Sequence, residues 1–215
     1  NLLGYGQRSL EKYDDAETAF KKYIELVPAD PNPYDSYAEL LMKTGRFDES
    51  IAQYRKALEL DSNFTPSRVG IATNLMLQGK HQEALAAMDE LDRLSRNDGD
   101  RRTALFVKGV ILTDAGKPEA AVKEIEKEFV VAERAGDSAN MSADVQLIGN
   151  ILLDAGRTDQ AAQRFRQALE LVEKSSLSDE VKTDTRLADR FNQARIALAK
   201  GDLATARTEA AAYLE

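Results

Sequence analysis

Apolar, small and turn-forming residues recur at fixed intervals along this chain. Residues 31–64 align with residues 65–98 over 34 positions without a gap. The pairs that fall on each other include Gly45 with Gly79, Ala52 with Ala86 and Leu60 with Leu94. The glycine of this pattern returns further along the chain at Gly116, Gly156 and Gly201. A period of about 20 to 50 residues indicates an array of stacked supersecondary units.

Each unit of the pattern predicts two helices joined by a tight turn. The chain is rich in Ala, Leu, Glu, Lys, Gln and Arg, which favour helices, and it lacks the Val-Ile-Thr runs of strands. The repeated glycine suits the left-handed conformation that ends a helix. A small residue in each first helix allows the second helix to cross closely. These small residues are Gly4, Ala38, Ala72, Gly109, Gly149 and Ala194.

Residues 31–64 carry the most complete version of the pattern. Their first helix has Tyr34, Tyr37, Ala38 and Leu41, followed by Gly45, Phe47, Ala57 and the exit segment 61–63. This arrangement resembles the tetratricopeptide repeat family, with Tyr34 in place of tryptophan and Ser62 in place of proline. The resemblance covers essentially the whole chain. It implies an all-α, right-handed solenoid of about six helix-turn-helix repeats and about twelve antiparallel helices.

We predict a single solenoid over residues 1–215 whose repeats lengthen along the chain. The expected repeats are 1–30 (clipped at its N-terminal end), 31–64, 65–98, 99–137, 138–176 and 177–215. The spacing of the turn position rises from 34 residues to 37, 40 and 45, which predicts longer second helices around 120–134 and 160–175. The later repeats resemble those of kinesin light chains and bacterial regulators. The two styles are expected to meet near Asn97–Asp100.

In tetratricopeptide proteins the first helices line a concave groove, and the resemblance implies a groove here. Its candidate residues are Asp35, Glu39, Met42, Val69, Thr73, Met76, Leu77, Phe106, Val107, Val110, Gln146, Leu147 and Asn150. The middle of this set is apolar and its N-terminal end is mixed and acidic. An exposed apolar surface of this length favours binding of an apolar helix or an extended peptide. In the alternatives, curvature packs these residues together or a flanking helix fills the groove.

Composition and motifs argue against most other chemistry. A net charge of -8 disfavours nucleic acid, and no apolar run is long enough to cross a membrane. There is no cysteine, and the single histidine, His81, occupies a packing position at the start of a second helix. No phosphate-binding or nucleophile motif occurs. Asn97–Asp100 resembles a fragment of a calcium loop, but helix capping explains it better. We therefore expect no catalysis, no metal and no cofactor.

The sequence favours a protein-interaction scaffold whose partner is a protein or peptide. One alternative is the sensory or regulatory arm of a larger bacterial signalling or transcription-regulating protein. Another is self-assembly into homo-oligomers through the terminal repeats, because residues 203–215 are alanine-rich and lack a polar capping face. We expect a soluble protein of the cytoplasm or periplasm. Because the chain starts at Asn1, any signal segment is expected to lie outside this fragment.

Overall fold

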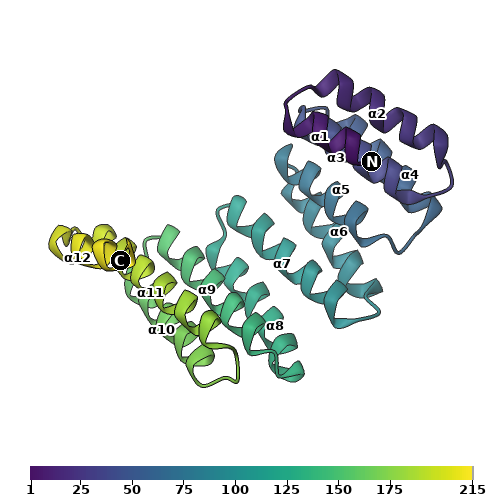
Figure 1. Ribbon diagram of the computed structural model, residues 1–215. Coiled ribbons are helices and arrows are strands. Elements are labelled where there is room, and N and C mark those ends of the chain that lie inside the picture. Colours follow the sequence, from purple (N-terminus) through teal and green to yellow (C-terminus); the bar gives the residue numbers. More distant parts are fainter. Residues whose placement is uncertain (215) are drawn as a thin grey trace. The chain divides into compact units, whose positions relative to one another are not determined.

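The computed structural model describes residues 1–214, which form twelve α-helices and no strand (Figure 1). The helices of the first half are α1 (Leu2–Ser9), α2 (Tyr13–Leu26), α3 (Pro31–Lys43), α4 (Phe47–Leu60), α5 (Thr65–Leu77), α6 (His81–Leu94) and α7 (Asp98–Asp114). Those of the second half are α8 (Pro118–Ala135), α9 (Ser138–Asp154), α10 (Thr158–Glu173), α11 (Asp179–Ala199) and α12 (Leu203–Leu214). The predicted all-α fold class is confirmed.

The chain forms two compact units, Asn1–Ala115 with α1–α7 and Gly116–Glu215 with α8–α12. The units divide after α7, whereas the change of repeat style was expected to place a junction near Asn97–Asp100. That segment instead begins α7, where the Asn97 side chain accepts a hydrogen bond from the backbone N–H of Asp100 at 2.8 Å. Its predicted capping role is confirmed. A single solenoid over the whole chain stays a prediction.

The repeated turn glycines adopt the left-handed conformation that their role requires. The φ angle is +76° at Gly45, and +73° at Gly79, and the corresponding glycines of the second unit have similar values. In the first hairpin the same position is Glu11, with φ +58°. A side chain is strained in this region of φ, so the first turn departs from the pattern at an energetic cost.

Small residues let the helices of a hairpin approach closely, as the pattern predicts. A Cβ atom at Gly4 would lie 2.6 Å from the ring of Phe20, and one at Gly149 would lie 2.5 Å from the ring of Phe165. Gly70 makes the same kind of space for the ring of Tyr54, which belongs to the preceding hairpin. Aromatic rings of the second helices therefore pack directly on the backbone of first helices at these glycines.

Apolar side chains fill the spaces between successive helices within each unit. In the first unit one buried cluster joins α2 to α3 and another joins α5, α6 and α7. The first cluster contains Ala16, Phe20, Tyr37, Leu40 and Leu41. The second contains Ala72, Ala84, Met88, Leu91, Ala104 and Ile111. Since each cluster draws on more than one hairpin, the hairpins are stabilised by stacking on their neighbours.

The helices from α7 to α11 are longer than those that precede them. The second helices α2, α4 and α6 have 14 residues each, and α8 and α10 have 18 and 16, so the predicted lengthening is confirmed. The first helices lengthen as well, from 13 residues in α3 and α5 to 17 in α9 and 21 in α11. The last helix, α12, has no buried residue.

Candidate functional site

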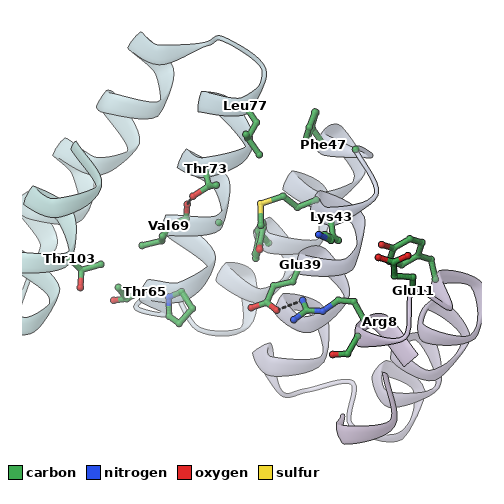
Figure 2. A pocket seen from close by; sticks show the side chains of 17 residues that line it. Arg8, Glu11, Glu39, Lys43, Phe47, Thr65, Val69, Thr73, Leu77 and Thr103 are labelled. Atoms are coloured by element: carbon green, nitrogen blue, oxygen red, sulfur yellow. Dashed lines mark hydrogen bonds and ion pairs between the residues drawn. The ribbon is translucent and has the colours of Figure 1, made fainter. Parts of the chain in front are cut away.

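A groove of about 1080 Å³ opens in the first unit (Figure 2). Its walls come mainly from α1, α3 and α5, with one residue from α7, and the turns after α1 and α3 close one side. The lining residues are Arg8, Ser9, Glu11, Tyr13, Glu39, Met42, Lys43, Gly45, Phe47, Tyr54, Thr65, Pro66, Val69, Gly70, Thr73, Leu77 and Thr103. First helices thus supply most of the surface.

Five of the predicted groove residues line this cavity. They are Glu39 and Met42 from α3, and Val69, Thr73 and Leu77 from α5. The three residues of α5 stand one helical turn apart and form one stripe along the helix. Figure 2 shows Val69, Thr73 and Leu77 along α5, with Thr103 of α7 on one side of this helix and Glu39, Lys43 and Arg8 on the other.

Other predicted residues of the first unit lie outside the cavity. Asp35 is buried and its carboxylate accepts a 2.7 Å hydrogen bond from the Ser67 hydroxyl, because the two hairpins stack there. Burial raises the pKa of Asp35 in spite of the Ser67 hydrogen bond, and the nearby Glu39 carboxylate adds to the rise. Met76 and Val107 pack against the core cluster of α5–α7.

Phe106 and Val110 lie on α7 and are exposed, by 44% and 36%. They do not line the cavity, although Thr103, one turn earlier in the same helix, does. The apolar stripe of α7 is therefore solvent-accessible surface next to the groove residue Thr103.

The last three predicted residues, Gln146, Leu147 and Asn150, belong to the second unit. They line a separate and smaller cavity of about 330 Å³ between α9, α10 and α11. There the Asn150 side-chain oxygen accepts a 2.7 Å hydrogen bond from Arg195. The predicted set thus divides between two units.

Several lining residues were not predicted, and most of them lie at helix ends or in turns. Arg8 stands 34 residues before Met42, so the repeat register could have placed it in the groove. Tyr13 and Phe47 also stand 34 residues apart, each as the first residue of a second helix. Sequence reasoning assigned this position to packing between hairpins and missed its exposed edge.

An ion pair joins α1 to α3 on the charged wall of the groove. The Arg8 guanidinium lies 2.9 Å from the Glu39 carboxylate, and it also stacks over the Tyr5 ring at 4.6 Å from the centroid. The Tyr5 hydroxyl donates to Ser36 at 3.1 Å. Burial raises the pKa of Tyr5, because the ionised phenolate loses solvation. This wall is therefore polar but largely paired within the protein.

His81 does not line the groove. It begins α6, and its Nε2 lies 2.7 Å from an Asp114 carboxylate oxygen at the end of α7. The contact ties two helices of the first unit together, in agreement with the structural role that its position predicts. Within residues 1–214 no helix is both long and apolar enough to cross a membrane.

Comparison with known proteins agrees with this architecture. Three sequence profiles described as tetratricopeptide repeat match residues 31–64, 69–139 and 146–177. The chain is 26% identical over 140 residues to anaphase-promoting complex subunit 3 of Schizosaccharomyces pombe, covering 65% of this chain and 20% of that protein. It thus spans about a fifth of that relative's length.

Solved structures share the fold at low sequence identity. The structure of Pseudomonas aeruginosa PilF superposes with a TM-score of 0.62 at 18% identity, over 97% of this chain and 86% of that one. PilW, described as a widely conserved type IV pilus biogenesis factor, gives 0.65 at 16% identity, over 98% and 88%. The profile matches span more than half of the chain and fall on hairpins with the expected turns. The chain belongs to the tetratricopeptide repeat family.

Proposed function

We propose that this protein is a non-catalytic interaction scaffold that binds a segment of a partner protein in the groove of its first unit. The observation that carries the proposal is a cavity of about 1080 Å³ with one apolar and one charged wall. Grooves of this kind suit peptide segments, which place side chains on both walls at once.

The stacked hairpins support a binding role. The residues below the groove are buried and tightly packed, with Leu40, Leu41 and Met88 almost fully buried. A groove built on such a core keeps its shape in the absence of a partner, which lowers the cost of ordering on binding. The lining offers no paired nucleophile and base among the residues described, which is consistent with binding alone.

The relatives support protein partners as a class. Anaphase-promoting complex subunit 3 is by name a component of a protein complex, and its similarity covers 65% of this chain. This similarity supports the view that repeats of this kind associate with proteins.

Affinity capture from the native source with the whole chain tests the proposal. Leu77→Asp places a charge on the apolar wall at a residue that is 53% exposed, so the fold should tolerate it. Leu60→Asp is the matched control, because Leu60 is 44% exposed and lies outside the groove. We expect partners captured by the unchanged chain and by Leu60→Asp to be lost with Leu77→Asp. Equal capture by all three would contradict binding in the groove.

Self-assembly is a second candidate, favoured by apolar side chains on the terminal helices. Leu3 of α1 is 66% exposed, and Leu203 and Leu214 of α12 are 58% and 83% exposed. Such residues favour stacking of one copy on another. Light scattering over a concentration series should show growth in mass that Leu214→Ser reduces, and a constant monomer mass would exclude it.

A further inference from the structure

The hydroxyl groups on the apolar wall of the groove already donate to the protein itself. Thr65 donates to the Asp100 carboxylate at 2.8 Å. Thr73 and Thr103 donate to backbone carbonyls one turn earlier in their own helices, at 2.9 and 3.0 Å. Each of these threonines therefore uses its hydroxyl hydrogen within the protein and has none left to donate to a ligand.

The opposite wall carries one ion pair and two charged side chains that are not in an ion pair within residues 1–214. Arg8 and Glu39 neutralise each other across a 2.9 Å contact. Lys43, the last residue of α3, lines the groove and makes no ion pair within residues 1–214. Glu11, in the turn after α1, also lines the groove and makes no ion pair within residues 1–214. The lining includes no asparagine or glutamine, and its remaining hydroxyl groups, those of Ser9, Tyr13 and Tyr54, belong to α1, α2 and α4 and not to α5.

These hydrogen bonds constrain the conformation of a ligand. An extended segment carries backbone N–H and C=O groups that need partners when they are buried, whereas a helix pairs them internally. The α5 wall offers methyl groups and apolar side chains and no free hydroxyl donor. It therefore disfavours a ligand that buries an extended main chain against α5. It favours a ligand that contacts α5 through its side chains only.

We infer that the groove binds an amphipathic α-helix, an inference that rests on the proposed function and names its ligand class. The stripe of Val69, Thr73 and Leu77 repeats every four residues, and such a row packs against a row of the same spacing on another helix. The ligand's apolar stripe lies on α5, and its polar flank faces α1 and α3. Lys43 is positively charged and makes no ion pair within residues 1–214. We therefore expect a carboxylate on that flank of the ligand.

The inference is tested with two displayed peptide libraries selected against the whole chain. One library is held helical by side-chain lactam bridges and has its exposed face randomised. The other has the same length and randomised positions, and a central proline prevents it from forming a continuous helix. Each selected peptide is then synthesised, and its affinity is measured by fluorescence anisotropy for the unchanged chain, Leu77→Asp and the control Leu60→Asp.

We expect the helical library to yield binders with apolar residues four apart, at least tenfold tighter than the best proline-containing peptide. Leu77→Asp should weaken them at least tenfold, and Leu60→Asp should not. Lys43→Glu should weaken them about threefold to tenfold, and exchanging the peptide's glutamate for lysine should restore binding to that variant.

Two results would overturn the inference. One of them leaves the proposed function in place, and the other contradicts it as well. If proline-containing peptides bind as tightly as helical ones and are equally sensitive to Leu77→Asp, the groove binds peptides but not as helices. The proposed function then stands alone. If neither library yields a binder that Leu77→Asp weakens, both the helix ligand and the groove itself are wrong.

Discussion

The hairpins of the two units share one pattern but carry different residues at equivalent positions. Counting ten, six and two residues back from the turn glycine gives Val69, Thr73 and Leu77 in the third hairpin. The same count in the fifth hairpin, in the second unit, gives Gln146, Asn150 and Asp154. The first set forms an apolar stripe in a large groove. Of the second set, Gln146 and Asn150 line a smaller cavity.

The polar residues at these positions in the second unit form a hydrogen bond and an ion pair between helices. In the second unit Arg195 donates to Asn150 at 2.7 Å and lies 3.7 Å from Asp154, which links α9 to α11. The amide nitrogen of Asn150 has no hydrogen-bond partner within residues 1–214 and remains able to donate. One framework of glycine turns and close crossings thus supports two kinds of surface.

The largest expected effect concerns the close crossings that both units share. Gly70→Ala should lower the free energy of unfolding by about 2 kcal/mol, because the new methyl group overlaps the buried Tyr54 ring. Gly149→Ala should have a similar effect in the second unit, against Phe165. Urea denaturation measures both.

Gly6→Ala is the control for these crossings, since a Cβ atom there meets nothing within 4 Å. It should leave stability unchanged or raise it by up to about 1 kcal/mol, through helix propensity alone. A loss for Gly6→Ala equal to that for Gly70→Ala would show that steric overlap is not the cause.

The second effect concerns two ion pairs, a partly buried one at Glu17 in the first unit and an exposed one between Glu119 and Arg157 in the second. Glu17 accepts hydrogen bonds from Lys21, Tyr37 and Arg46, each between 2.6 and 2.7 Å. Burial opposes ionisation of Glu17, but these three partners lower its pKa to about 2. A lowered pKa stabilises the fold above the ordinary value of 4.5, and this stabilisation is lost as the pH falls towards 2.

Glu17→Gln should therefore lower the free energy of unfolding by about 1 to 2 kcal/mol at pH 7, allowing for screening by solvent. The difference from the unchanged chain should shrink between pH 4.5 and pH 2. Thermal unfolding across this range measures it. Glu119→Gln removes the exposed pair with Arg157 in the second unit and should change stability little. A difference for Glu17→Gln that stays constant with pH would contradict the linkage.

A third comparison uses the second helices at the two ends of the chain. Ile24 of α2 and Leu214 of α12 both stand thirteen residues after their turn position. Ile24 packs against a core cluster, whereas Leu214 is 83% exposed. Ile24→Ala should cost about 1 kcal/mol, and Leu214→Ala should stay within about 0.5 kcal/mol. Equal costs in chemical denaturation would mean that α12 is covered in solution.

The smallest effect concerns the one turn that lacks glycine. Glu11→Gly should raise the free energy of unfolding by about 0.5 kcal/mol, because it relieves the positive φ of +58°. Gly45→Ala, the converse change at φ +76°, should lower it by about 1 kcal/mol. Melting temperatures of the two variants should therefore move in opposite directions, and a shift in the same direction would contradict the role of this position.

The sequence by itself determined the hairpin, because each of its requirements falls on a single residue type at a fixed spacing. A turn glycine such as Gly79 and a small residue such as Gly149 are needed for reasons that a local pattern displays. Five groove residues, including Thr73 and Leu77, followed from the resemblance to the tetratricopeptide repeat family together with the repeat register.

Only the tertiary structure decided which of the remaining candidates face a cavity. Asp35 occupies a groove position in the register, yet stacking of the next hairpin buries it against Ser67. Arg8 forms an ion pair with Glu39 on the same wall of the groove, whereas Lys43 makes no ion pair within residues 1–214. Burial and pairing depend on contacts between residues distant in the chain, and a repeating pattern specifies the position of a side chain but not the residues that reach it.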